Sequence, residues 1–397
     1  MKRPTLIEIL KTALHVGTIG YGGPAYLAVM KKVLVHEKAW LSEEEFMNAL
    51  SLAQLLPGAV GVTMFGYIGH KLKPPWGGLL VPFTFVLPAM SAITILAWAY
   101  FTFGNLTFVH AIFTGLGAMV VALLVNATLI MGKSVFSKID RNSYKGIVIA
   151  ALAFVAMMFL RWNVVYIILL SGLLGFLFLY FSGEFEQEIM PAKVKVEIIT
   201  PKVRRRQNYL PVFVLTGLLL AIFLFVNGTW IIFTTFLKIG ALAFGGGFTA
   251  IPLIQHVVVD GRQWLDLAAF RDGIALGQIT PGPVLITATF IGYKVAGLIG
   301  ALIASIGIFS PSLVAIVLLS RAHAKVQNLK IVKVIIKGFL SGFIGLLLFI
   351  IYQFALHSLI NWQSVIIFII SFLYLVVWKK DTIWLILSTI CVSLLLF

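Results

Sequence analysis

The residues best suited to hold a ligand lie where glycine and proline interrupt long apolar segments. One interruption is Gln278–Pro283 (QITPGP), and a related one, Gln54–Ala59 (QLLPGA), lies 224 residues earlier. Proline and glycine end a helix, and the helix that restarts behind them begins with backbone N–H groups that have no partner in the helix. Each restart also carries roughly half a positive charge from the helix dipole, which suits an oxyanion.

A glycine-rich interruption precedes each of these two segments. Tyr21–Pro24 (YGGP) lies before the first, and Phe244–Gly247 (FGGG) lies before the second. Glycine and proline in a membrane helix can also serve only packing or kinking, but four interruptions at related positions favour a binding site. Half-helices are therefore predicted to start at mid-depth of a membrane near Pro24, Gly58, Gly247 and Pro283.

Several ionisable side chains fall within the same apolar segments. Lys238 and His15 each lie about two helical turns before a glycine-rich interruption, and a later segment contains the pair Arg271-Asp272. Because a charge inside a membrane is costly, such groups are functional candidates. We expect Lys238 and Arg271 to balance the charge of a bound anion. The candidates for ion coupling are His15, Lys238 and Asp272.

Two alternatives for these charges stay open. Lys238, like Lys11, could extend along its helix to the membrane surface. Arg271 and Asp272 could form an internal pair that serves structure alone.

Amide and hydroxyl side chains complete the predicted site. Gln54 and Gln278 lie three residues before the prolines of their interruptions, so their amides could donate to an anion or bond to another helix. The full set of predicted substrate-binding residues is Gly22, Gly23, Pro24, Gln54, Pro57, Gly58, Thr63, Lys238, Gly245, Gly246, Gly247, Arg271, Gln278, Pro281, Gly282, Pro283 and Thr287.

The composition places these interruptions in a membrane protein. Hydrophobic residues make up 60% of the 397-residue chain and charged residues 11%, against about 25% charged residues in soluble domains. Runs such as 166–181 and 210–226 are continuous rather than alternating, which favours helices over a β-barrel. We predict an all-α polytopic membrane protein with about 13 transmembrane helices, several of them broken at the Gly/Pro motifs.

Charge, cysteine content and motifs exclude other classes of protein. The net charge of +16 comes from bases in short loops between spans, as membrane orientation requires, so we expect no nucleic-acid partner. The lone cysteine, Cys391, excludes an intrachain disulfide and a multi-cysteine metal site. No catalytic or nucleotide-binding motif occurs, so we predict no enzyme activity, no cofactor and no metal.

The two halves of the chain repeat each other. With an offset of 223 or 224 residues, the Gly-rich and Pro-Gly motifs of the first half match those of the second, and the order of matches holds over roughly seventy residues. Further matching pairs are Trp40 with Trp264, Phe46 with Phe270, Thr63 with Thr287, and Pro88 with Pro311. The predicted domains are an N-terminal membrane repeat (1–182), a charged cytoplasmic linker (183–208), a connecting helix (209–229) and a C-terminal repeat (230–397).

Loop charges predict that the second repeat is inverted. Counting one crossing for each span places most lysines and arginines on one side when the N-terminus is inside, as the positive-inside rule requires. In this count residues 31–44 lie outside and Lys71 inside. The N-terminus and linker are predicted cytoplasmic and the C-terminus outside. Inverted repeats place a transporter's substrate site where broken helices meet near the midplane.

At these motifs the sequence resembles the chromate ion transporter family in its long, two-domain form. The motifs that carry the resemblance are YGGP at 21–24, WLS at 40–42, LAQLLPG at 52–58, FGGG at 244–247 and QITPGP at 278–283. The resemblance implies a carrier in the cytoplasmic membrane that moves chromate outward, with sulfate as a mimic. It also implies that an ion gradient, rather than ATP, drives transport.

Three hypotheses for function follow. The first is a secondary active transporter of a tetrahedral oxyanion, chromate or sulfate-like, with half-helix starts binding the oxygens. The second is an ion-coupled carrier of another small anion or solute, and the third is a membrane scaffold that transports nothing. Membrane lipid is an expected partner, and a homodimer is left open.

Overall fold

The computed structural model describes residues 4–20, 25–74, 76–136, 143–180, 228–319, 330–378 and 382–397, with residues 217, 221 and 225. Regular structure in these ranges is helical throughout, which confirms the predicted all-α fold. The first half contains α1 (Leu6–Ile19), α2 (Ala25–Lys31), α3 (Glu43–Leu55), α4 (Val60–Leu72), α5 (Trp76–Phe103), α6 (Thr107–Val135), α7 (Ser143–Leu160) and α8 (Val164–Gly175). The second contains α10 (Trp230–Leu242), α11 (Ala250–Gln255), α12 (Leu267–Ile279), α13 (Thr287–Leu319), α15 (Lys330–Ser358), α16 (Trp362–Leu373) and α17 (Thr382–Leu396).

Several of these helices have the length and composition of membrane spans. Four described segments are long and apolar enough, by length and composition, to cross a membrane: Trp76–Phe103, Thr107–Val135, Val284–Ala315 and Ile331–Ser358. The third is not one continuous helix, because its backbone is non-helical at Ala296 and Gly297. Shorter apolar helices accompany them at Tyr144–Leu160, Val164–Phe178, Trp230–Leu242, Trp362–Trp378 and Thr382–Leu396. Large apolar side chains such as Leu298 and Phe159 lie on the surface, as is expected where lipid replaces water.

One compact unit comprises residues 1–94, 194–242 and 281–325. It contains α1 to α4 and most of α5 from the first half, and α10 and α13 from the second. Two glycines allow close helix packing here. A Cβ at Gly17 would lie 2.1 Å from the carbonyl oxygen of Phe85, and a Cβ at Gly240 would lie 2.2 Å from that of Ile308. Both glycines therefore bring helices into backbone contact, as small residues do in membranes.

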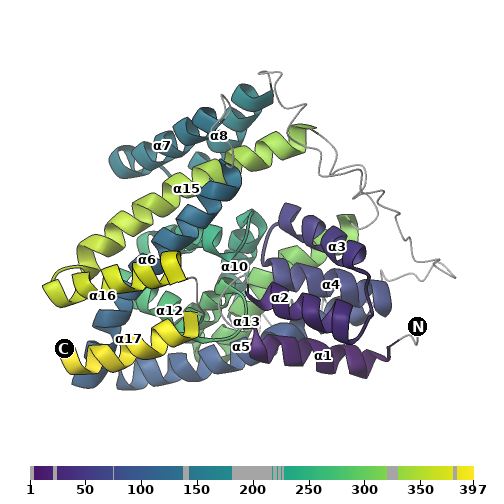
Figure 1. Cartoon of the computed structure of the whole chain (residues 1–397), viewed down its shortest axis with the longest axis horizontal. Coiled ribbons are helices and arrows are strands. Elements are labelled where there is room, and N and C mark those ends of the chain that lie inside the picture. Colours follow the sequence, from purple (N-terminus) through teal and green to yellow (C-terminus); the bar gives the residue numbers. More distant parts are fainter. Residues whose placement is uncertain are drawn as a thin grey trace. The chain divides into compact units, whose positions relative to one another are not determined.

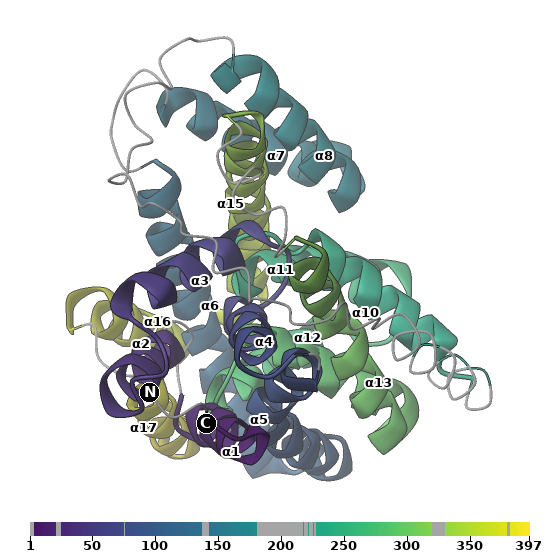
Figure 2. The same cartoon turned by 90° about the vertical axis from the view of Figure 1, so that its right-hand side faces the viewer.

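The second compact unit comprises residues 95–193, 243–280 and 326–397. Its centre is α15, which packs against α6, α7 and α8, while α16 and α17 pack against α6. In both views α7 and α8 lie along α15 (Figures 1 and 2). The short helix α12 contacts α6 and α17, and this position is where the second unit holds its buried charges.

Local structures recur at the offset that the sequence predicts. Helices α3 and α12 both have 13 residues and begin 224 residues apart. A π-helix precedes each of them, at Lys32–Glu37 and His256–Gly261. The amides of Trp40 and Trp264 donate to the carbonyls of Leu34 and Val258, each at 2.9 Å. These coincidences support a duplication, while the inverted orientation and the domain boundaries stay predictions.

The prediction that residues 42–71 cross the membrane once is wrong. Lys71 Nζ, at the end of α4, lies 2.6 Å from Glu45 Oε1, at the start of α3. The two helices therefore run antiparallel, and Gln54–Ala59 forms the turn of a hairpin rather than a kink within one span. It follows that residues 31–44 and Lys71 lie on the same side, not on opposite sides. Sequence counting missed this because a Pro-Gly break permits either a kink or a reversal.

An ion pair and a helix cap fix the loop that leads into this hairpin. Ser42 and Glu45 form the predicted capping box, which is confirmed by hydrogen bonds in both directions. Glu43 pairs with Lys31, and the hydrogen bond from Lys31 holds the pKa of the Glu43 carboxyl below its ordinary value. The acidic first turn also complements the dipole of α3.

Some predicted features lie outside the described residues. They include the interruption residues Gly22, Gly23 and Pro24, the linker 183–208 and most of the connecting helix 209–229.

Candidate functional site

Both Pro-Gly motifs end a helix, as predicted. Helix α3 ends at Leu55 and α4 begins at Val60, while α12 ends at Ile279 and a 3-10 turn begins at Val284. Gly58 has φ of +102° and Gly282 has φ of +121°, a left-handed conformation that favours glycine. The glycines of both motifs are therefore required by the backbone itself.

The helix starts at these two turns have no side-chain cap, which is also true of α6 behind Leu106. Thr5, Ser42 and Asp266 cap α1, α3 and α12 with side-chain oxygens. Ala59 and Pro283, the caps behind the two Pro-Gly turns, provide no side-chain hydrogen bond. Neither cap residue therefore occupies the N–H groups of these two restarts, and apart from the Gly61 N–H, which donates to Tyr26, they are available to an anion.

Each Pro-Gly turn packs against a proline-containing helix of the other half of the chain, α13 or α5. A Cβ on Gly58 would lie 1.8 Å from Ser312 Oγ, and Ser312 donates to the carbonyl oxygen of Pro57 at 3.0 Å. In the same unit, a Cβ on Gly282 would lie 3.1 Å from the Cβ of Ala89. Ala89 and Ser312 are related by the repeat offset of 223, since each follows a matched proline. The turn of each half therefore contacts the other half of the chain, and the two contacted residues are related by the repeat.

The Gly282 turn also meets the end of α1. Gly282 donates its N–H to the carbonyl oxygen of Gly20 at 3.0 Å. This bond joins the second Pro-Gly interruption to Gly20, the C-cap of α1 and the residue just before the first glycine-rich interruption.

Tyr26 is a component of this cluster that sequence reasoning missed. Its hydroxyl accepts a hydrogen bond from the N–H of Gly61, in the first turn of α4, at 3.1 Å. A Cβ on Gly20 or Gly61 would come within 2.6 Å of the tyrosine side chain, and the ring packs against Phe85 at 5.8 Å between centroids. Tyr26 is therefore held tightly beside the α4 helix start, with its hydroxyl at the restart where an oxyanion is predicted to bind.

Tyr26→Phe is expected to lower the melting temperature of the purified protein and to weaken transport. The change leaves the buried Gly61 N–H without its acceptor, which costs about 1–3 kcal/mol. Tyr166→Phe, at an exposed tyrosine of α8, is the matched control. Equal melting temperatures for the two variants would contradict this assignment.

The predicted threonine hydroxyls are engaged within their own helices. Thr63 donates to the carbonyl of Ala59 at 3.1 Å, and Thr287 donates to that of Val284 at 3.0 Å. Both side chains are buried. In this conformation their single hydroxyl hydrogens are used, so the backbone N–H groups are the better anion donors.

The second glycine-rich interruption is also present. Gly245 and Gly246 have φ of +84° and +116°, and a 3-10 turn over Gly247–Thr249 leads into α11. The Gly245 backbone lies against Leu340 of α15, which a Cβ would approach to 2.1 Å. This interruption belongs to the second unit.

Arg271 and Asp272 form a buried network. Arg271 donates through Nε and Nη2 to Asp272 Oδ1 at 3.0 and 2.8 Å, and through Nη1 to Ser358 Oγ at 2.9 Å. Tyr100 donates its hydroxyl hydrogen to Asp272 Oδ2 at 3.0 Å. The charged side chains are only 11% and 7% exposed. The guanidinium lies against α6, since a Cβ on Gly117 would be 2.7 Å from Arg271 Cζ. The internal pair that the sequence left open is thus present.

The two predicted glutamines differ. Gln278 is buried, and its Nε2 has no hydrogen-bond partner among the described residues. It follows Arg271 by seven residues, so both lie on one face of α12 at about 10 Å along the helix. Gln54 is exposed. The structure therefore distinguishes a buried, unpaired amide in the second half from a surface amide in the first.

Lys238 and His15 are not part of these clusters. Both are exposed, on the faces of α10 and α1 opposite the residues that these helices bury. The two residues, which the repeat relates, are therefore also alike in their exposure.

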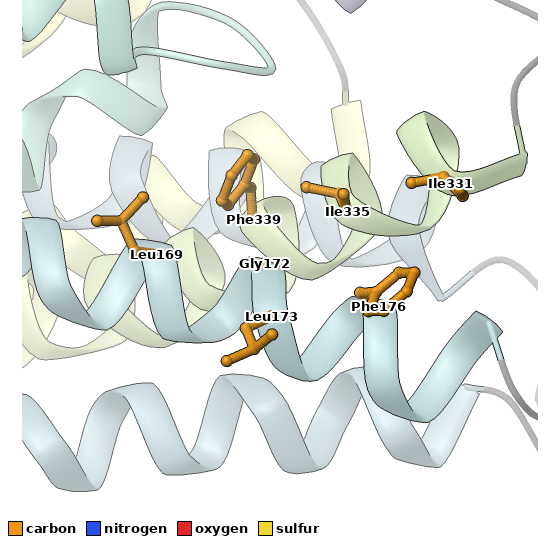
Figure 3. Close-up of a pocket in the computed structure, with 7 residues that line it drawn as sticks. All are labelled: Leu169, Gly172, Leu173, Phe176, Ile331, Ile335 and Phe339. Atoms are coloured by element: carbon orange, nitrogen blue, oxygen red, sulfur yellow. The ribbon is translucent and has the colours of Figure 1, made fainter.

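Other features of the described chain do not suggest a catalytic or metal site. No group of three or more His, Cys, Asp or Glu residues that could hold a metal occurs in the ranges described above. A groove of about 380 Å³ between α8 and α15 is apolar, as Figure 3 shows. Its lining residues are Leu169, Gly172, Leu173, Phe176, Ile331, Ile335 and Phe339. Such a groove suits hydrocarbon rather than an oxyanion.

The missed residues had only weak signals in the sequence. Ser312 could have been found, because it follows one member of the Pro88–Pro311 pair. Tyr100 and Ser358 carry no such mark, since they lie 172 and 87 residues from their partners in the α12 network.

Comparison with known proteins agrees with the resemblance noted from the motifs. The family model described as "Chromate transporter" matches residues 7–176 and 230–394, regions that fall within the two predicted repeats. No solved structure matches.

Similar curated proteins cover most of the chain. An uncharacterised transporter of Methanocaldococcus jannaschii is 33% identical over 94% of this chain and 90% of its own. The chromate transport protein of Cupriavidus metallidurans is 28% identical over 95% and 89%, and that of Pseudomonas aeruginosa 29% over 86% and 79%. With its helical fold, its paired Pro-Gly turns and this extended similarity, the chain belongs to the chromate transporter family.

Proposed function

We propose that this protein is a secondary active transporter that exports chromate across the cytoplasmic membrane, with sulfate bound as a mimic. Membership of the chromate transporter family supports chromate as the cargo. The observation that carries the binding mode is the pair of helix starts at Ala59 and Pro283, which have no side-chain cap. The N–H groups at these starts, other than the Gly61 N–H that donates to Tyr26, are suited to the oxygens of a tetrahedral dianion.

The charge of the dianion requires cationic partners as well. We propose Arg271 and Lys238 for this role, and His15, Lys238 and Asp272 as candidates for ion coupling. Lys238 and His15 are exposed in this conformation, so their participation requires access from the surface that they face. Loss of chromate flux in Lys238→Ala, with unchanged melting temperature, is the result that this role predicts.

The orientation in the membrane is part of the proposal. The N-terminus and the linker are assigned to the cytoplasm and the C-terminus to the outside, with the second repeat inverted relative to the first. Because α3 and α4 form a hairpin that adds no crossing, this assignment requires an even number of crossings among the other helices of the first repeat. Cysteine-labelling from each side of the membrane tests this assignment. A C-terminal label that reacts only from the cytoplasm would contradict it.

Chromate flux into proteoliposomes is the direct test of function. The purified chain is reconstituted, a chromate gradient is imposed, and uptake is followed with sulfate, molybdate and organic acids as competitors. Saturable chromate flux that sulfate inhibits supports the proposal. Transport of an organic acid without chromate would favour a carrier of another solute, and no flux of any solute would favour a scaffold.

Gln278→Leu is expected to weaken chromate binding without destabilising the fold. The leucine removes a buried amide that has no partner at Nε2, so the melting temperature should stay the same or rise. A hydrogen bond to a charged ligand is worth about 1.5–3 kcal/mol, which corresponds to roughly 10- to 100-fold in affinity. Gln363→Leu, at the start of α16, is the matched control. Unchanged chromate affinity in Gln278→Leu would exclude its amide from the site.

A further inference from the structure

We infer that Asp272 competes with the transported oxyanion for Arg271, so that oxyanion binding in the second unit is linked to uptake of a proton by Asp272. This inference rests on the proposed function, because it assumes an oxyanion cargo, and it assigns that cargo a specific partner and a specific proton.

Arg271 already binds an anion, the carboxylate of Asp272. Its Nε and Nη2 both donate to one carboxylate oxygen of Asp272, and this edge of the guanidinium is one with which arginine binds carboxylates and tetrahedral oxyanions alike. The carboxylate therefore occupies the position that an oxyanion would take on this guanidinium.

The guanidinium is positioned independently of Asp272. Ser358 accepts from Nη1 at 2.9 Å, and the group lies against the backbone at Gly117. These contacts come from α15 and α6, so they persist when the carboxylate is displaced. Arginine has five N–H donors, and its bonds to Asp272 and Ser358 use three, which leaves donors for a ligand.

A second donor without a partner lies on the same helix face. Gln278 is 5% exposed, its Nε2 has no acceptor among the described residues, and it lies two turns from Arg271. A buried amide nitrogen without an acceptor is costly in a folded protein. An anion that moves along this face of α12 and accepts a hydrogen bond from Gln278 Nε2 explains why this nitrogen has no partner in the protein.

The net charge of the site changes when a dianion binds. Arg271 and Asp272 together are neutral, and binding a dianion beside the ionised carboxylate would leave two net negative charges in a buried site. A proton from solvent, taken up on a carboxylate oxygen of Asp272, reduces the net charge of the site from two negative charges to one. It also weakens the attraction between Asp272 and Arg271. The proton returns to solvent when the oxyanion leaves and the ion pair re-forms.

Few other ionisable groups act on Asp272. Tyr100 from α5 donates to it, and Asp266 at the start of α12 is the further charge that acts on it. Helix α17 carries no Asp, Glu, Lys, Arg or His, and α6 carries His110 and Lys133 close to its two ends. Beside Ser358, the ring of His357 is bonded to the carbonyl of Gln353. Asp272 is therefore the group expected to take the proton.

The test measures chromate affinity of the purified protein against pH, in wild type and Asp272→Asn. The asparagine cannot ionise, whereas the titration of chromate itself is the same for both proteins. We expect wild-type affinity to rise more steeply as pH falls, with a difference in slope of about one proton, or about tenfold per pH unit. Identical slopes would overturn the inference while leaving the proposed function intact. Failure of the wild type to bind chromate at any pH would overturn both.

Two further measurements apply if Asp272→Asn does not fold. Titration of wild type with sulfate, which stays fully ionised, in buffers of different ionisation enthalpy counts the protons taken up; the expected count is about one, and zero would overturn the inference. Tyr100→Phe removes a hydrogen bond to the carboxylate. The midpoint of the pH profile should then move to higher pH, whereas a purely structural role for Tyr100 would change stability without moving it.

Discussion

Gly58→Ala is expected to abolish chromate transport and to lower the melting temperature markedly. Gly58 has φ of +102°, and an alanine Cβ would lie 1.8 Å from Ser312 Oγ. Left-handed backbone with a side chain costs about 1–2 kcal/mol per residue, and the collision adds to this cost. Because Ser312 is bonded to Pro57, the turn cannot move aside without losing that hydrogen bond. The measurements are thermal unfolding in detergent and flux in proteoliposomes.

Comparison variants separate the collision from the backbone strain. Gly58→Ala with Ser312→Ala removes the Oγ but leaves the strained φ and a Cβ contact of 3.2 Å, so stability should recover only in part. Gly282→Ala combines φ of +121° with a contact of 3.1 Å to Ala89, so a smaller loss is expected there. Gly132→Ala is the control, since its Cβ would meet its nearest neighbour at 3.9 Å within a regular helix. Wild-type flux in Gly58→Ala would show that the turn does not need its observed conformation.

Arg271→Met should be the most disruptive single change in the second unit. It removes the cation that neutralises Asp272, whose side chain is 7% exposed. Breaking a buried ion pair by removing one partner costs about 3–5 kcal/mol, because the other charge is left buried and uncompensated. We expect a sharply lower melting temperature together with loss of chromate flux.

The double variant Arg271→Met with Asp272→Asn distinguishes a structural role from a binding role. It removes both charges, so most of the stability should return. If Arg271 also binds the oxyanion, flux and chromate affinity stay lost although the protein is stable again. Recovery of flux in the double variant would show that the pair serves structure alone, and would remove Arg271 from the proposed site.

The sequence by itself determined the features that depend on local chemistry. Continuous apolar runs predicted helices, because only a helix satisfies its own backbone in lipid. Pro57-Gly58 and Pro281-Gly282 predicted where helices end, and their glycines do adopt the left-handed conformation that other residues avoid. The capping box at Ser42 was predictable for the same reason, since its two hydrogen bonds span only three residues.

The tertiary structure decided how these local features combine. A Pro-Gly break can kink a helix or reverse the chain, and only the contact of Lys71 with Glu45 reveals the reversal in the first half. Likewise, the sequence could not reveal the buried network around Arg271-Asp272, because Tyr100, which donates to Asp272, lies 172 residues from it along the chain. Local propensity fixes where a helix begins and ends, whereas the neighbours of a side chain depend on which helices pack together. The positions of the breaks could therefore be read from the chain, while the partners of the residues around them could not.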